Sequence, residues 1–178
     1  ALGYEKDEVD IICAGLNHQT WYISVKHKGE SLLDKILPAF EKDPYLARTE
    51  KVRIDILRRF GYFSTESNGH LSEYLPWYRK RGAEKDRYMD YSVWAGGETG
   101  GYLRVCRESR HDYQQNYPKW MSGELDQIKL GERSHEHGSW IIEALETGRR
   151  YWGCFNVANT GLITNLPHGC TVELPCIV

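Results

Sequence analysis

The sequence predicts an α+β fold, in which helices pack on a mixed β-sheet. Short runs of β-branched and aromatic residues near both ends of the chain are typical of strands. Segments between them have apolar residues three and four positions apart, as amphipathic helices do. The length of 178 residues suits one domain with a substantial core, so we treat 1–178 as a single domain.

Two strands are expected first, at about 9–14 and 21–27. The segment between them contains Gly15, Asn17 and His18, and it predicts a strand edge that delivers polar groups to one place. A glycine there would let the backbone approach a ligand closely. A lone histidine beside apolar strands is more often an ordinary hydrogen-bonded residue than a ligand, so this segment alone identifies no site.

Helices follow in the middle of the chain. One is expected from Ser31, and Pro38 predicts a kink or break within it. A second is expected over about 49–59, because Thr49 can cap it, its apolar residues share one stripe, and Gly61 can end it.

A short helix or turn is expected at 71–75, after a break at Gly69. His70, Glu73 and Tyr74 are gathered in this segment. On composition alone, the simpler interpretation is a surface turn whose tyrosines pack on their neighbours.

The next segments are charged and then rich in glycine. Residues 79–92 predict a solvated helix face or loop. Residues 96–101 lack the lysine and hydroxyl residue of a phosphate loop, so we expect a flexible hinge. A helix at about 101–117 would follow, in a mobile or oligomer-forming excursion.

A clear helix is expected over 133–147, with Ser134 as a possible cap. The run His135, Glu136, His137 suggests a metal site, but residues two apart on a helix face different directions. Helix capping and packing are therefore the preferred interpretation.

The chain is expected to end in strands at about 152–159, 162–167 and 171–175, separated by turns. Asn156 and Asn159 are compatible with ordinary turn residues.

The composition excludes several classes of protein. A net charge of −2 and a pI near 6.4 argue against a nucleic-acid-binding protein, which should carry a basic face. No apolar run approaches membrane-spanning length. The five cysteines form no CxxC pair and no disulfide pattern, which favours reduced thiols in a cytoplasmic enzyme.

Five blocks of the chain, taken together, resemble glycoside hydrolase family 4 in its α-galactosidase-like branch. The blocks follow in the order found in that family: GLNHQTW at 15–21, EKVR at 50–53 with FGYFSTES at 60–67, HLSEYLP at 70–76, RSHEHGS at 133–139, and NVANTGLITNLP at 156–167. No single block is specific, but their order covers nearly the whole chain.

The resemblance implies a C-terminal substrate- and metal-binding part of a two-domain enzyme. Members of the family begin with a NAD-binding Rossmann domain and a Cys-His-Ser metal motif, and neither is found in 1–178. The chain is thus expected to be part of a longer enzyme that continues beyond Val178. NAD and Mn²⁺ are the implied cofactors, and a homodimer or homotetramer is the implied assembly.

The implied reaction is the hydrolysis of α-galactosides or related α-glycosides by oxidation, elimination, addition and reduction. The family stands apart from the glycosidases that use two carboxylates. The sugar is oxidised at C3, a tyrosine removes the C2 proton, and the aglycone leaves. Water then adds and the sugar is reduced again.

The resemblance assigns roles to particular residues. His18 matches the metal-binding histidine of the family, Tyr74 matches its catalytic base, and Tyr78 is the alternative base. Cys13 is a poor candidate for the missing cysteine ligand, because it lies within a strand. Substrate contacts are implied for Asn17, His70, His137 and Asn159.

Three alternatives remain at this point. The specificity is open among α-galactosides, α-glucosides and α-uronides. A second alternative is that the chain alone is a catalytically silent domain that binds a sugar or metal. A third alternative is a simple metallohydrolase that uses His18, His135 and His137.

Overall fold

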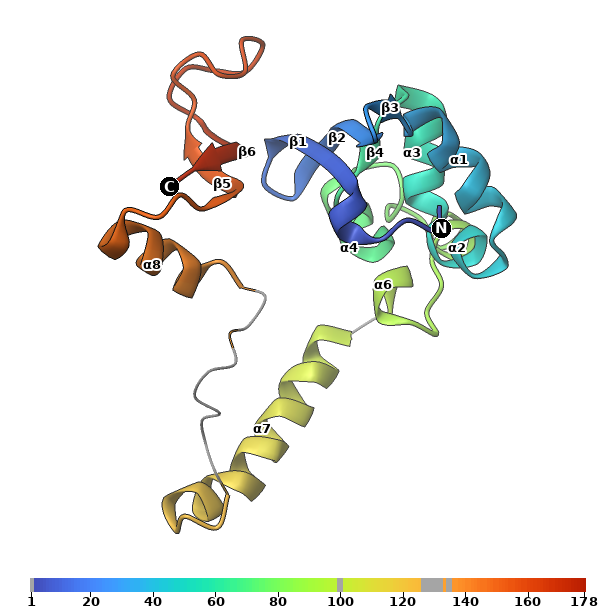
Figure 1. Ribbon diagram of the computed structural model, residues 1–178. Coiled ribbons are helices and arrows are strands. Elements are labelled where there is room, and N and C mark those ends of the chain that lie inside the picture. The colour runs from blue at the N-terminus through green and yellow to red at the C-terminus, as the bar shows by residue number, and fades with distance from the viewer. Residues whose placement is uncertain (1, 99–100, 126–132, 134–135) are drawn as a thin grey trace. The chain divides into compact units, whose positions relative to one another are not determined.

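The computed structural model describes residues 2–98, 101–125, 133 and 136–178 (Figure 1). Within the predicted domain 1–178, these residues form two compact units. The first comprises Ala1–Glu98 and Trp152–Ile177, and the second comprises Thr99–Tyr151 with Val178.

The first unit combines a six-stranded sheet with short helices, which confirms the predicted α+β class. Its strands are β1 (Val9–Leu16), β2 (Gln19–His27), β3 (Glu30–Ser31), β4 (Phe63–Ser64), β5 (Trp152–Ala158) and β6 (Thr171–Ile177). Its helices are the 3₁₀ turn η1 (Lys6–Glu8), α1 (Leu33–Lys42), α2 (Pro44–Thr49), α3 (Lys51–Phe60), α4 (Asn68–Tyr74), α5 (Gly82–Tyr88) and α6 (Trp94–Gly97).

The strand order is β3-β2-β1-β6-β5, and β4 pairs with β2 outside this path. The sheet was expected to be mixed, yet every pairing among the described strands is antiparallel. A short connection explains this direction for β1 and β2. Strands β1 and β2 are joined by two residues, which suffices for an antiparallel pair but not for a parallel crossover.

The hairpin between β1 and β2 brings Gly15 against its own partner strand. Gly15 has φ +152°, and a Cβ at this position would lie 2.4 Å from the carbonyl oxygen of Gln19. The close approach predicted for this glycine is therefore to β2 and not to a ligand. In the turn, His18 takes a left-handed conformation with φ +50°, and its backbone N–H donates to Oδ1 of Asn17 at 2.8 Å.

Two clusters of buried side chains form the core of the first unit. One joins α3, α4 and the segment that follows α4, and it contains Val52, Ile56, Leu71, Tyr78 and Met89. The other joins β2, α1 and β4, and it contains Val25, Leu32, Ile36 and Phe63. Helices α1 and α3 accordingly lie beside the β2, β3 and β4 part of the sheet (Figure 1).

The helices differ from the predictions at their ends. Helix α1 continues through Pro38 to Lys42, so the predicted break is absent. Thr49 does not cap α3. It is the last residue of α2, where its hydroxyl donates to the carbonyl of Tyr45. Gly61 ends α3 in the left-handed conformation, as predicted.

Helix α4 is held by a close contact between glycines. Gly69 lies within α4, and a Cβ there would be 2.7 Å from Cα of Gly97. The prediction of a break at Gly69 is therefore wrong. The predicted hinge at 96–101 also differs, because Gly96 and Gly97 are buried and form a packing surface. Small residues are needed here because the two backbones touch.

Asn68 fixes the start of α4 through its buried side-chain amide. Its Oδ1 accepts from the backbone N–H of Val52 at 2.6 Å, and its Nδ2 donates to the carbonyls of Tyr88 and Gly96. One amide therefore ties α4 to the beginning of α3, the end of α5 and α6. A buried polar group with all its partners satisfied holds a segment in one position.

The loop between β5 and β6 replaces the strand predicted over 162–167. Its residues form bends and turns, and Asn159 organises them from a fully buried position. The side-chain amide of Asn159 donates to the carbonyls of Ile163, Leu166 and Pro167, and its Oδ1 accepts from the N–H of Ile163.

The second unit contains α7 (Gly101–Met121) and α8 (Gly138–Thr147). Helix α7 is longer than predicted, and α8 begins later than predicted, with His137 before its first residue. The predicted cap Ser134 and its neighbour His135 lie outside the described residues. Among the described helices, none is long and apolar enough to cross a membrane.

Candidate metal and proton-transfer site

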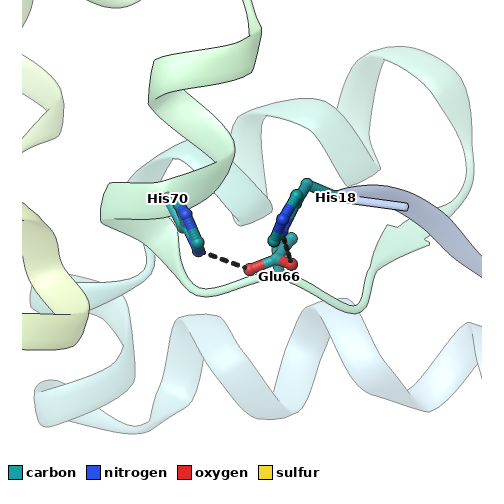
Figure 2. A group of neighbouring side chains, drawn as sticks. All are labelled: His18, Glu66 and His70. Atoms are coloured by element: carbon teal, nitrogen blue, oxygen red, sulfur yellow. Dashed lines mark hydrogen bonds and ion pairs between the residues drawn. The ribbon is translucent and has the colours of Figure 1, made fainter. Parts of the chain in front are cut away.

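One carboxylate lies between two imidazoles in the first unit (Figure 2). Glu66 Oε1 is 2.7 Å from Nδ1 of His18, and Glu66 Oε2 is 3.0 Å from Nδ1 of His70. The two imidazole rings are 4.8 Å apart between centroids. These three side chains come from separate segments: the β1–β2 turn, the loop after β4, and α4.

The loop that carries Glu66 is held by hydrogen bonds to buried backbone. Arg53 on α3 donates to the carbonyl of Ser64 through both Nε and Nη2, and its guanidinium stacks 4.1 Å from the ring centre of Phe63. The hydroxyl of Ser64 accepts from the N–H of Glu66, while Thr65 donates to Thr20 on β2. The carboxylate is therefore placed by the sheet and α3 together.

Helix α4 adds His70 and Tyr74, which are one turn apart on the same face. The Tyr74 ring stacks on the His18 ring, with 4.9 Å between centroids and 8° between planes. Tyr74 is also 5.5 Å from His70 between centroids. The phenol consequently forms one group with the two imidazoles that Glu66 holds.

The group is open on one side. The side chains of His18 and His70 are 41% and 42% exposed, and that of Glu66 is 21% exposed. Tyr74 is 46% exposed. A polar ligand can thus reach the group while Glu66 stays largely covered.

The donor atoms fit a divalent cation. One ligand atom each from His18, Glu66 and His70 can be chosen so that all lie within 4.8 Å of one another. Imidazole nitrogen and carboxylate oxygen are ligands that first-row divalent metals accept. Since Nδ1 of His18 is bonded to Glu66, Nε2 is the ring nitrogen of His18 that can face an ion. A carboxylate behind a ligating histidine is a common arrangement in metal sites.

Comparison with known proteins decides the family. A model described as the family 4 glycosyl hydrolase C-terminal domain matches residues 13–178. The chain belongs to this family. It is 51% identical over 178 residues to an α-galactosidase of Rhizobium meliloti (strain 1021), covering 99% of this chain and 36% of that protein. It is 35% identical over 178 residues to an α-galactosidase of Bacillus subtilis (strain 168), covering 99% of this chain and 39% of that protein.

Solved structures share the fold of this family 4 chain. The lplD protein of Bacillus subtilis gives a TM-score of 0.72 at 22% identity, covering 99% of this chain and 42% of that one. A 6-phospho-α-glucosidase from gut microorganisms, solved in complex with NAD and Mn²⁺, gives a TM-score of 0.56 at 18% identity. The match covers 98% of this chain and 39% of that one. The family 4 chain therefore spans about two fifths of the length of the relatives it matches.

Several residues predicted from the family resemblance are gathered in this group. His18, His70 and Tyr74 lie together in the first unit, and Asn17 lies in the same turn as His18. The side chain of Asn17 is exposed, and its Nδ2 has no hydrogen-bond partner among the described residues. All four residues keep their predicted roles as proposals.

Tyr78 is unsuited to be the alternative base. It is 2% exposed, packs in the core, and donates its hydroxyl proton to Asp55 at 2.8 Å. The pKa of Tyr78 is raised above its usual value, mainly by burial and secondly by the hydrogen bond to Asp55. A phenol in this position is held in its neutral form.

Asn159 is also unsuited to its predicted role. Its amide is fully buried and is used by the β5–β6 loop, so it has no atom left for a sugar hydroxyl. The turn interpretation of this asparagine was the better one.

His137 lies in the second unit. Its Nδ1 is 2.7 Å from the hydroxyl of Tyr151, and the indole of Trp140 stacks on Tyr151 with 14° between planes. The predicted contact of His137 with substrate stays a prediction. The metal site that would combine His135 with His137 falls partly outside the described residues.

Glu66 was missed as a site residue, although it lies in one of the quoted sequence blocks. Glu66 precedes His70 by four residues, a spacing that would be a usable signal within a helix. However, Glu66 is not in a helix, so the i, i+4 rule gives no reason to expect this pair.

The surroundings of Cys13 agree with its description as a poor candidate ligand. It is 9% exposed, and burial, with smaller contributions from Cys154 and Glu173, raises the pKa of its thiol to about 11. Only the thiolate binds metal or reacts readily, so this sulfur is held in the inert form.

A simple labelling experiment tests this assignment. A pKa about two units above normal lowers the thiolate fraction near pH 8 roughly a hundredfold. With iodoacetamide under native conditions, Cys13 should therefore be alkylated at least that much more slowly than the exposed Cys106. Peptide mass spectrometry over time gives both rates, and a denatured sample should show equal labelling. Equal rates in the native protein would contradict the assignment.

Proposed function

We propose that this chain is the substrate- and metal-binding part of an α-glycosidase that depends on NAD and a divalent metal, with α-galactosides as its substrates. The similarity to two α-galactosidases over 99% of the chain supports the substrate class. The single observation that carries the mechanism is the group of His18, Glu66, His70 and Tyr74. In this group a phenol stacks on one candidate metal ligand.

We assign His18 as the metal ligand, through Nε2. When bound, the divalent ion supplies positive charge that acidifies a sugar proton next to a carbonyl, and NAD supplies the hydride acceptor that makes this carbonyl. Glu66 accepts the Nδ1 proton of His18, which leaves the lone pair of Nε2 directed away from the carboxylate. We assign no contact with NAD to residues of this chain.

Tyr74 is assigned as the base that removes the C2 proton of the sugar. A tyrosine near neutral pH needs a nearby cation to hold its phenolate. Its stacking on His18 brings the phenol next to the ring that would carry the ion. Its 46% exposure leaves the ring accessible to a sugar.

His70 and Asn17 are assigned to sugar hydroxyls. The Nδ1 of His70 is bonded to Glu66, so its Nε2 is the nitrogen that remains for a hydroxyl. The Nε2 atom lies 3.9 Å from a carboxylate oxygen of Glu73, too far for a hydrogen bond. Asn17 offers its amide from the adjacent turn.

The deciding experiment is hydrolysis of 4-nitrophenyl α-galactoside by the complete protein that carries this chain. It should be run under reducing conditions with and without NAD and Mn²⁺, and with substrate deuterated at C2. We expect activity only with both additions, and a slower rate or loss of label with the deuterated sugar. Activity indifferent to NAD would contradict the mechanism and favour a conventional metallohydrolase.

The remaining alternatives have distinct outcomes. Activity on α-glucosides or α-uronides alone would keep the mechanism and change the substrate. Inactivity of the complete protein on α-galactosides, α-glucosides and α-uronides, with Mn²⁺ binding retained, would indicate a silent metal-binding domain. The cytoplasmic location and the homodimeric or homotetrameric assembly stay predictions.

A further inference from the structure

A second feature of the first unit is an apolar hollow, two of whose lining residues directly follow site residues in the chain. It has a volume of about 490 Å³, within the usual range for small-molecule sites. Its lining includes Gln19, Trp21, Phe60, Tyr62, Leu75 and Trp77. None of these residues has a role in the chemistry proposed above.

The hollow is continuous with the site along the chain at two points. Gln19 follows His18, and Leu75 follows Tyr74. Consecutive Cα atoms are about 3.8 Å apart. Two stretches of backbone that line the hollow therefore continue directly into the residues assigned to the metal and to proton transfer.

The walls offer rings that are accessible from solvent. Phe60 and Trp77 stack with 6.0 Å between centroids and 24° between planes, and they are 52% and 53% exposed. Tyr62 is 49% exposed. The face of an aromatic ring is negatively polarised, so it attracts the slightly positive C–H bonds on the face of a sugar ring. Such rings are large apolar surfaces that a folded chain normally covers.

Gln19, which lines the hollow and follows His18 in the chain, carries an unsatisfied polar group. Its Nε2 is buried and has no hydrogen-bond partner among the described residues. A buried amide without a partner is costly, and a ligand hydroxyl would remove that cost. An apolar protein surface docked on the hollow would leave this amide unpaired, whereas a sugar would satisfy it.

We propose that this hollow binds the leaving group of the glycoside, and that this leaving group is a second sugar ring. The inference rests on the proposed function, because it places the scissile bond between the hollow and the His18–Tyr74 pair. The apolar face of the second sugar lies on Trp77 and Phe60, and one of its hydroxyls accepts from Gln19. The preferred substrates are accordingly α-galactosyl disaccharides or oligosaccharides.

The test compares two substrates of the complete protein that differ only in the leaving group. One is an α-galactosyl disaccharide with a glucose leaving group, and the other is α-galactosyl fluoride, which has no second ring. For Trp77→Ala, the ratio of kcat/KM on the disaccharide to that on the fluoride should fall about tenfold or more, mainly through KM. Gln19→Ala should lower the same ratio of kcat/KM values. This second variant keeps the inference testable if Trp77→Ala does not fold.

Trp152→Ala is the matched control. Trp152 is 55% exposed, close to the 53% of Trp77, but it lies on β5 and does not line the hollow. It should leave the ratio at the wild-type value. Molar mass by light scattering should be unchanged in all three variants.

Three outcomes would overturn the inference. Equal losses on both substrates would show that Trp77 supports the fold or the chemistry and not the leaving group. A smaller assembly in Trp77→Ala would identify the hollow as a surface between subunits. A wild-type protein inactive on both substrates would remove the proposed function itself, which distinguishes that failure from the other two.

Discussion

Replacing Tyr74 by phenylalanine should lower kcat on 4-nitrophenyl α-galactoside by about 10²- to 10⁴-fold, with little change in KM. The substitution removes only the hydroxyl, so the ring can still stack on His18. Proton removal by a positioned side chain contributes a rate factor of this size. The loss should appear in kcat because the phenolic oxygen acts on the proton in the transition state and adds little to ground-state binding.

The matched control is Tyr78→Phe, which removes a hydroxyl four residues away. That hydroxyl is bonded to Asp55 in the core, so its loss should reduce the free energy of unfolding by about 1 kcal/mol and leave kcat within a few fold of wild type. Exchange of the C2 hydrogen with solvent offers a second measurement. If Tyr74→Phe kept both kcat and this exchange, the base would have to be another residue.

The strands and the middle helices could be predicted because their signals are local. The hairpin of β1 and β2 follows from two β-branched runs around a short polar turn, and Gly61 ends α3 as such glycines usually do. The boundaries that failed depend on residues distant in sequence. Gly69 looked like a helix break, yet it lies inside α4, because its missing side chain is required by contact with Gly97.

The candidate site shows the same division. His18 and Tyr74 were found because each lies in a sequence block that resembles the family. The chemistry of an imidazole and of a phenol is also known from the residue type. The carboxylate that joins His18 to His70 was not found, since its position depends on Arg53 and on the pairing of β4 with β2. Asn159 misled the prediction for a related reason. An asparagine looks the same in sequence whether its amide faces a ligand or closes its own loop.

Glu66→Gln should weaken Mn²⁺ binding by about 10- to 100-fold, the usual effect of losing a partner behind a ligating histidine. Glutamine keeps the shape of the side chain but removes the negative charge. The two bonds to His18 and His70 are short and charge-assisted in the wild type, at 2.7 and 3.0 Å. A neutral amide can accept from only one of the two rings through its oxygen, and its NH₂ group opposes the Nδ1 proton of the other.

Titration of free Mn²⁺ by electron paramagnetic resonance measures this affinity without any substrate turnover. Glu73→Gln is the control, because Glu73 is 55% exposed and lies 3.9 Å from Nε2 of His70, beyond hydrogen-bond distance. It should leave the Mn²⁺ affinity unchanged. If Glu66→Gln bound Mn²⁺ as well as the wild type but lost activity, the carboxylate would act on the sugar or on Tyr74, and not through the orientation of His18. The affinity and kcat measured on one variant therefore separate the two roles that the position of Glu66 permits.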